Sequence, residues 1–116
     1  MHELSIAEGI VDIVAEASEK QGDARVTAVH LRLGALAGVV EEALLFSFEV
    51  AAAGTAAEKA ELRIERIPVT VYCPLCQRER VLPGRQPVAC PECGTPTPSV
   101  ISGTELEVVA LEVESD

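Results

Sequence analysis

The sequence has very few aromatic residues, and this limits the kind of core that it can form. Of its 116 residues, only Phe46, Phe48 and Tyr72 are aromatic, and tryptophan is absent. Hydrophobic residues nevertheless make up 48% of the chain, which is enough to bury the core of one small domain. That core must therefore be built mainly from aliphatic side chains.

Long apolar runs and export signals are also missing. No apolar stretch reaches the roughly 20 residues that a membrane-spanning helix requires, and no segment resembles a signal peptide. The composition therefore predicts a soluble, cytoplasmic protein that does not bind a membrane.

Positive charge is scarce. Nine Lys and Arg residues face 19 Asp and Glu residues, so the formal net charge is −10. Because nucleic-acid binding draws largely on Lys and Arg contacts with phosphate, this balance disfavours DNA or RNA as a partner. Groups for catalysis are equally few: His2 and His30 are the only histidines, and the sequence shows no nucleophile–base pair or phosphate-binding loop. We therefore expect that the protein is not an enzyme.

The four cysteines form two identical pairs, Cys73-Pro74-Leu75-Cys76 and Cys90-Pro91-Glu92-Cys93. Two sulfurs separated by two residues on a tight turn can bind one metal ion. Two such turns form the four-sulfur tetrahedral cage that zinc prefers in structural sites. Gly94 follows the second pair, where a backbone with positive φ lets N–H groups point at the sulfurs. The pattern therefore predicts a structural zinc site formed by Cys73, Cys76, Cys90 and Cys93.

These cysteines have three alternative uses. Two disulfides suit a chain without an export signal poorly, and a thioredoxin-like redox site needs one pair at the start of a helix. Iron in the same cage, with electron transfer as its role, fits the ligands as well as zinc does. The rest of the chain suits a role other than redox chemistry, and this favours zinc.

Hydrophobic periodicity predicts an α+β fold: two helices packed on a three-stranded mixed sheet, with an inserted four-cysteine zinc-ribbon subdomain. Apolar residues recur at helical spacing in two segments and alternate along three others. The two strands that flank the second helix should be joined by a right-handed crossover, which makes them parallel. The expected helices cover the first residues to about 20 and residues 40–53, and the expected strands cover 26–33, 60–67 and 105–114.

The cysteine segment lies between the second and third of these strands. We therefore expect an α/β domain of residues 1–68, completed by a strand within 103–114, and an inserted zinc-binding ribbon at 69–102. Inside the ribbon, residues 78–82 and 86–89 are interpreted as two hairpin arms.

Within the predicted α/β domain, the second helix and the first strand allow predictions for individual residues. On the second helix, the pairs Leu44 with Phe48 and Phe46 with Val50 are expected to mark the apolar side. His30 lies on the polar side of the first strand, where a solvent-side histidine is more common than a metal ligand.

The amino terminus offers a second candidate metal site. The Met1 amine, the His2 amide nitrogen and the His2 imidazole Nδ1 can close two fused chelate rings on one ion. Nitrogen-rich, planar coordination suits Ni(II) and Cu(II), and the first N–H groups of a helix have no partner within the helix. The fourth position is left to Glu3, through its amide or its carboxylate, or to a partner protein. A histidine near a terminus is, however, usually just solvated.

A series of motifs follows in order along essentially the whole chain: Met1-His2-Glu3 with Ser5, VHLRLGALAG at 29–38, Phe46-Ser47-Phe48-Glu49, Leu62-Arg63-Ile64-Glu65, the paired cysteines and Gly103-Thr104-Glu105-Leu106. This series resembles the HypA/HybF family. Members of this family are nickel metallochaperones for the maturation of [NiFe]-hydrogenases, and some also serve urease. One departure is Thr95, where the family usually has Ser; it keeps the hydroxyl.

The resemblance implies that His2 and Glu3, with the Met1 amine, bind the nickel that is transported, and that the four cysteines bind a structural zinc ion. It further implies a HypB-like maturation GTPase and the hydrogenase large-subunit precursor as partners of a monomer or weak homodimer. Glu42, at the start of the second helix, is a further carboxylate near which nickel could bind, but it is equally well interpreted as a surface residue that stabilises the helix dipole. The alternative function is a zinc-ribbon adaptor that binds proteins without transferring nickel.

Overall fold

The computed structural model describes residues 2–83, 89–97 and 99–114. Its strands form two three-stranded sheets, with the orders β2-β1-β6 and β4-β3-β5. Along the chain, the elements are α1 (Glu3–Lys20), β1 (Val26–Gly34), α2 (Glu41–Ala52), β2 (Glu61–Ile67), β3 (Thr70–Cys73), β4 (Arg78–Val81), β5 (Val100–Ser102) and β6 (Leu106–Val113).

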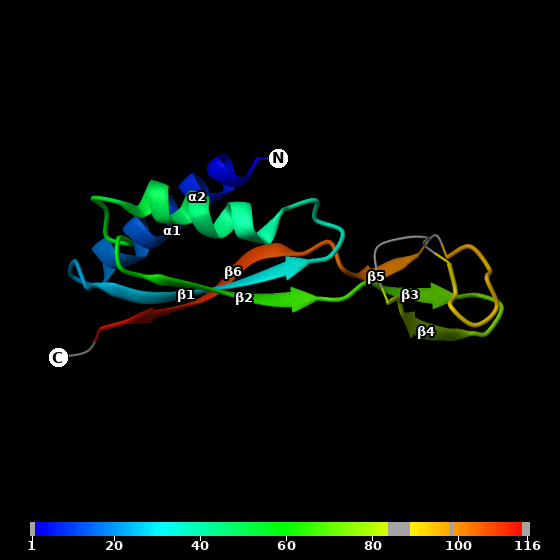
Figure 1. Ribbon diagram of the computed structural model, residues 1–116. Coiled ribbons are helices and arrows are strands. Elements are labelled where there is room, and N and C mark those ends of the chain that lie inside the picture. Colours follow the sequence, from blue (N-terminus) through cyan, green and yellow to red (C-terminus); the bar gives the residue numbers. More distant parts are fainter. Residues whose placement is uncertain (1, 84–88, 98, 115–116) are drawn as a thin grey trace. The chain divides into compact units, whose positions relative to one another are not determined.

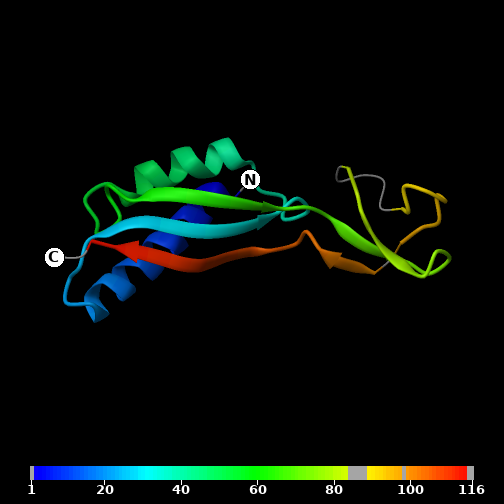
Figure 2. The same ribbon diagram turned by 90° about the horizontal axis from the view of Figure 1, so that it is seen from below.

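The β2-β1-β6 sheet carries both long helices on one face (Figure 1). In Figure 2 the arrows of β1 and β2 point the same way, and the arrow of β6 points the opposite way. The sheet is therefore mixed, and the predicted parallel pairing of the two strands that flank α2 is confirmed. Within the part of the chain that the structure describes, no helix combines the length and apolar character needed to cross a membrane.

The chain divides into two compact units. The first unit contains residues 1–31, 38–64 and 108–116, and the second contains residues 32–37 and 65–107. These boundaries fall inside β1, β2 and β6, whereas the sequence pattern places the boundary next to Pro68, between 68 and 69. The separate ribbon domain at 69–102 thus stays a prediction.

The core of the first unit is aliphatic, apart from the ring of Phe48. It brings together residues from α1, β1, α2 and β2, so each of these elements contributes apolar side chains to one core. Val108 and Leu111 of β6 pack against the same cluster. The buried residues of this cluster are Ala7, Ile10, Val11, Val14, Val26, Val29, Leu31, Leu44, Phe48, Ala52, Ala57 and Leu62.

The sequence-based prediction for α2 is wrong for two residues. Leu44 and Phe48 are buried, as expected, but Phe46 and Val50 are 67% and 56% exposed. Residues 44, 48 and 52 follow one another at four-residue intervals and share one side of the helix. A residue two positions away is rotated by about 200° and points to the other side. Because α2 is apolar on both sides, its pattern alone did not distinguish the buried stripe from the exposed one.

The second sheet pairs its strands differently from the predicted hairpin. β4 lies antiparallel to β3, with Arg80 opposite Val71 and Arg78 opposite Cys73. β5, which the sequence pattern does not predict, pairs with the other edge of β3. The described partner of the first predicted arm is therefore β3, and most of the second arm, residues 86–88, lies outside the described residues.

Candidate metal centre

Each cysteine pair lies on a tight turn, and the two turns are built in the same way. The Gln77 N–H donates to the Cys73 carbonyl over 2.8 Å, and the Gly94 N–H donates to the Cys90 carbonyl over 2.9 Å. Gln77 and Gly94 both have positive φ, 56° and 75°. The positive φ predicted for Gly94 is confirmed. At Gln77 the same conformation is held by a residue with a Cβ, which disfavours it.

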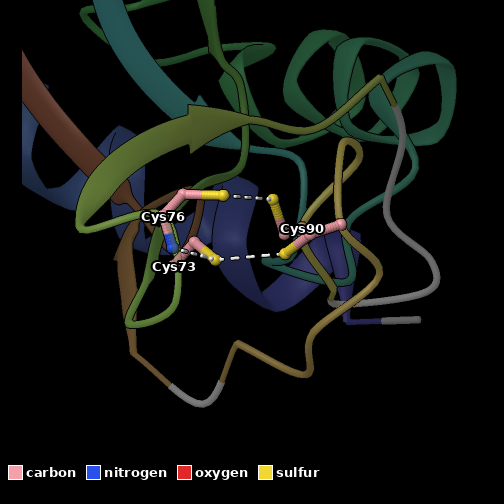
Figure 3. A group of neighbouring side chains, drawn as sticks. Cys73, Cys76 and Cys90 are labelled. Atoms are coloured by element: carbon pink, nitrogen blue, oxygen red, sulfur yellow. Dashed lines mark hydrogen bonds between the residues drawn. The ribbon is translucent and has the colours of Figure 1, made fainter.

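The turns bring the four sulfur atoms together. All four Sγ atoms lie within 4.8 Å of one another. Cys73 Sγ is 3.5 Å from Cys93 Sγ, and Cys76 Sγ is 4.0 Å from Cys90 Sγ. Figure 3 shows the sulfurs of Cys73, Cys76 and Cys90 converging on one space between the turns.

These distances fit a single tetrahedral ion. Zn–S bonds of about 2.3 Å give sulfur–sulfur edges of roughly 3.8 Å in a tetrahedron, and the measured separations span this value. The cysteines are free thiols, and their sulfurs lie well beyond the roughly 2.05 Å of a disulfide bond. The donor set, its number and its spacing therefore match a closed, structural metal site.

Hydrogen bonds and crowding shift the pKa values of these thiols in opposite directions. The Cys93 backbone N–H is the main cause that lowers the pKa of Cys90 to about 6, and the Thr95 hydroxyl lowers the pKa of Cys93. Arg80 lowers the pKa of Cys76, but the other three cysteines and burial outweigh it and raise this pKa to about 11. Four thiolates side by side thus repel one another, and a divalent cation between them removes this penalty.

Two side chains beside the cysteines were not found from the sequence. Arg80 donates from Nη2 to Glu92 Oε2 over 2.9 Å. Glu92 lies between the two cysteines of the second turn, so this ion pair joins β4 to that turn. Only the register of β4 against β3 brings Arg80 to this place, and the sequence pattern had paired the same residues with a different segment.

His2 lies at the surface, at the start of α1. It is the N-cap residue, its side chain makes no capping hydrogen bond, and its carbonyl accepts from the Ile6 N–H at 2.9 Å. Its side chain is exposed. Met1, whose amine belongs to the predicted nickel site, lies outside the described residues. The nickel site therefore stays a prediction.

Glu3 has a different environment from His2, because its side chain is only 9% exposed. Its Oε2 accepts a hydrogen bond of 3.0 Å from the Val40 N–H. Val40 is the N-cap residue of α2, and its own side chain makes no capping hydrogen bond. The amino-terminal charge and the Val40 N–H lower the pKa of Glu3 to about 2. A carboxylate from the first turn of α1 thus secures the start of α2.

The other two residues considered from the sequence have surface roles. His30 Nε2 lies 2.5 Å from Glu112 Oε2, which also accepts from Arg63 Nη1 over 2.7 Å. His30 alternates with the buried Leu31 on β1, which agrees with the expected solvent-side histidine. Glu42 is exposed in the first turn of α2.

Comparison with known proteins gives matches along nearly the whole chain. The family model described as "Hydrogenase/urease nickel incorporation, metallochaperone, hypA" matches residues 1–113. The "Hydrogenase maturation factor HypA" of Roseiflexus sp. (strain RS-1) is 53% identical over 116 residues, which cover 100% of this chain and 94% of that protein. The protein of the same description from Chloroflexus aggregans is 54% identical over 112 residues, which cover 97% of this chain and 98% of the relative.

Solved structures show the same fold at low sequence identity. The "Solution structure of HypA protein" has a TM-score of 0.72 and 19% identity, and the match covers 100% of this chain and 98% of that one. The "Solution structure of the Ni metallochaperone HypA from Helicobacter pylori" has a TM-score of 0.66 and 20% identity, with 100% of both chains covered. The two structures support the fold, whereas the family model and the relatives of more than 50% identity establish the family membership. The resemblance inferred from the motifs is confirmed, and the chain belongs to the HypA family of hydrogenase and urease nickel-incorporation metallochaperones.

Proposed function

We propose that this protein binds Ni(II) at its amino terminus and delivers it during the maturation of [NiFe]-hydrogenase, with urease as a second recipient in organisms that contain it. The observation that carries the proposal is the match to the nickel-incorporation family over residues 1–113. The nickel ligands are the Met1 amine, the amide and Nδ1 of His2, and Glu3.

The surroundings of His2 and Glu3 support this site and sharpen it. The His2 side chain is exposed and makes no capping hydrogen bond, so metal binding leaves the core unchanged. The Glu3 carboxylate already accepts from the Val40 N–H, and drawing it to nickel would weaken the start of α2. We therefore assign the Glu3 contribution to its amide nitrogen. Of the two options left open by the sequence, this one keeps the helix pair intact.

The four-cysteine site has a structural task in this proposal. Four sulfurs fill the tetrahedral coordination of zinc, so the ion has no open position for cargo. Its binding supplies folding free energy, because the ligands are gathered only in the folded chain. The geometry of the two matched turns and the sulfur spacing supports zinc in this role.

Transfer requires an acceptor that can reach the bound nickel. The four terminal nitrogen ligands fill one plane around the ion, and the positions above and below this plane stay open to a partner protein, which we propose to be a HypB-like maturation GTPase or the hydrogenase large-subunit precursor. The protein acts in the cytoplasm as a monomer or weak homodimer, without catalysing a reaction itself. The charge distribution supports protein partners over nucleic acid: the first unit contains 14 acidic and 4 basic residues, and the second contains 5 of each.

Calorimetric titration of nickel into untagged protein tests the site. The variants are His2→Ala, which removes the imidazole, and a chain with one residue added before Met1, which moves the amine out of the chelate ring. We expect at least ~100-fold weaker binding for His2→Ala, taking an anchoring ligand as roughly 3 kcal/mol. The matched control is His30→Ala, which should bind nickel like the parent.

The outcomes separate the two candidate functions. Undiminished nickel binding in His2→Ala would move the site elsewhere in the chain. A parent protein that holds zinc but binds no nickel would contradict nickel transfer and support the zinc-ribbon adaptor. Zinc content and circular dichroism should be the same in all four proteins, because the apolar stripe of α1 does not include His2.

A further inference from the structure

Arg80 occupies an unusual position for an arginine on an edge strand. It lies on β4 opposite Val71 of β3, and Val71 is completely buried. Opposite residues of an antiparallel pair point to the same face of the sheet. The Arg80 side chain is accordingly only 15% exposed. Arg78 lies two residues earlier on the same strand and is exposed.

The guanidinium of Arg80 reaches both cysteine turns. Its Nη2 donates to Glu92 Oε2 over 2.9 Å, and Glu92 lies between Cys90 and Cys93. Arg80 itself follows the first turn. Hydrogen bonds with Cys76, and to a lesser extent Cys90, contribute to a raised Arg80 pKa, together with the charge of Glu92. The guanidinium is therefore joined to the second turn by an ion pair, and it is carried by β4, the strand that directly follows the first turn.

One N–H group of the Arg80 guanidinium has no acceptor. Nε is buried and donates no hydrogen bond within the part of the chain that the structure describes. A buried N–H without a partner is unfavourable. Thiolates are stronger acceptors than thiols, because a charged partner strengthens a hydrogen bond. The guanidinium therefore interacts better with the deprotonated, metal-bound cysteines than with four thiols.

The charge of Arg80 also favours the deprotonated, metal-bound state of the four cysteines. Four thiolates around one divalent zinc ion carry a net charge of −2, and Cys73 and Cys90 are buried. A buried charge is stable only when it is paired. The Arg80 guanidinium offsets part of this charge at the site itself, and Glu92 fixes its orientation from the exposed side.

We propose that Arg80 is a positioning residue of the cysteine site, whose guanidinium, anchored by Glu92, donates to the sulfurs of both turns and stabilises their metal-bound arrangement. This inference rests on the proposed binding of zinc by the four cysteines. It adds a residue that is not a ligand to the centre.

The test measures zinc affinity in the full, untagged chain by competition with a chelator of known affinity. Arg80→Ala should weaken zinc binding by about 10- to 100-fold, the usual effect of removing a partner of a metal ligand. Arg80→Lys keeps the charge but loses the planar set of donors, so it should recover only part of the affinity. Arg63→Ala is the control: it removes an exposed arginine from β2 of the first sheet, away from the cysteines, and should stay within ~2-fold of the parent.

A second measurement distinguishes a role at the sulfurs from a general loss of structure. Cobalt(II) bound in place of zinc gives a sulfur-to-metal charge-transfer band. Hydrogen bonds to the sulfurs lower their donor strength, so Arg80→Ala should move the band to lower energy while Arg63→Ala leaves it in place. Should Arg80→Ala fail to fold, Glu92→Gln, which removes only the anchor, is expected to weaken zinc binding to a smaller extent and shift the band in the same direction.

Several results would overturn the inference. One is an Arg80→Ala protein, or in its absence a Glu92→Gln protein, with zinc affinity within ~2-fold of the parent and an unshifted band. Weaker binding without a shift of the band would also contradict it, since Arg80 would then act through the fold alone. A parent protein that binds no zinc would instead refute the proposed role of the cysteine site. Nickel binding by these variants should equal that of the parent, which keeps this test separate from the terminal site.

Discussion

Removing zinc should unfold the cysteine-containing part of the chain and leave the helices in place. The perturbation is either a strong chelator or the substitution Cys73→Ser, which removes one of four ligands. Cys73 is fully buried at the end of β3, next to the two turns. The prediction follows from the presence of two separate hydrophobic clusters, one in each unit.

The sizes of these two clusters determine how much apolar burial contributes to the folding free energy of each unit. Among the residues of the second unit that the structure describes, this cluster contains Val69, Val71 and Leu82 as buried residues, with Leu36 packed against them. Three buried aliphatic side chains contribute on the order of 5–9 kcal/mol, whereas zinc binding by such a site contributes roughly 10 kcal/mol or more. If the four cysteines bind zinc as proposed, the ion would therefore supply the larger part of the folding free energy in this unit. The cluster of the first unit has twelve buried residues among those that the structure describes, so we expect this unit to fold without the metal.

Hydrogen exchange measured residue by residue is the appropriate assay. Without zinc, the amides of β3 and β4, such as the Leu82 N–H that donates to Val69, should lose protection. Amides of α1 and α2 should keep theirs. Persistent protection of β3 and β4 in metal-free protein would refute the reasoning, because the small cluster would then suffice. Loss of protection in α1 would also refute it, because the two units would not be independent. Cys93→Ser, at an exposed ligand, should also abolish tight zinc binding but disturb β3 less.

Two further predictions concern α2 and its start. Phe48→Ala should lower the free energy of unfolding by about 3–5 kcal/mol, while Phe46→Ala, on the exposed side, should change it by less than ~0.5 kcal/mol. Urea unfolding of the two variants measures both effects. Equal losses of stability would contradict the assigned buried and exposed sides of α2. Glu3→Gln should reduce the stability of the first unit at neutral pH, because the depressed pKa of Glu3 means that its charged form stabilises the fold. That contribution is complete above pH 4.5 and disappears as the pH falls towards about 2, so the difference in urea midpoint between parent and Glu3→Gln should narrow on acidification. A difference that is independent of pH would exclude the charge as its cause. Nickel affinity should change far less in Glu3→Gln than in His2→Ala.

The sequence allowed prediction of those features whose causes are local. The cysteine cage was found from spacing alone, because two residues between cysteines suffice to define each turn. The positions of α1 and of the three strands of the first sheet were also predicted, because apolar residues recur at helical spacing in α1 and alternate along the strands. Their faces were predicted less well, since Leu4 and Ile13 of α1 and Leu106 and Val113 of β6 are exposed. Even the positive φ at Gly94 could be predicted, because glycine favours this conformation. The positive φ at Gln77 could not, because glutamine rarely adopts it.

The features that the sequence did not reveal depend on pairing over long distances. The contact between Glu3 and Val40 spans 37 residues, and no local pattern links the two. Arg80 belongs to the cysteine site only because β4 pairs with β3, and a hairpin with a later segment was an equally reasonable interpretation of the same residues. β5 has three residues, too few for its alternation to be recognised.

The contact between Glu3 and Val40 bears on how a terminal chelate can function. A chelate made from a mobile terminus must lose conformational freedom when it binds metal, and this weakens binding. Here the residue directly after His2 is held against the start of α2 by a buried carboxylate. In the proposed site, the amides of His2 and Glu3 would therefore be ordered before nickel arrives, while the imidazole is exposed. Such a site would combine ordered amide ligands with one exposed ligand, and the imidazole is the group that an acceptor protein could reach and displace first.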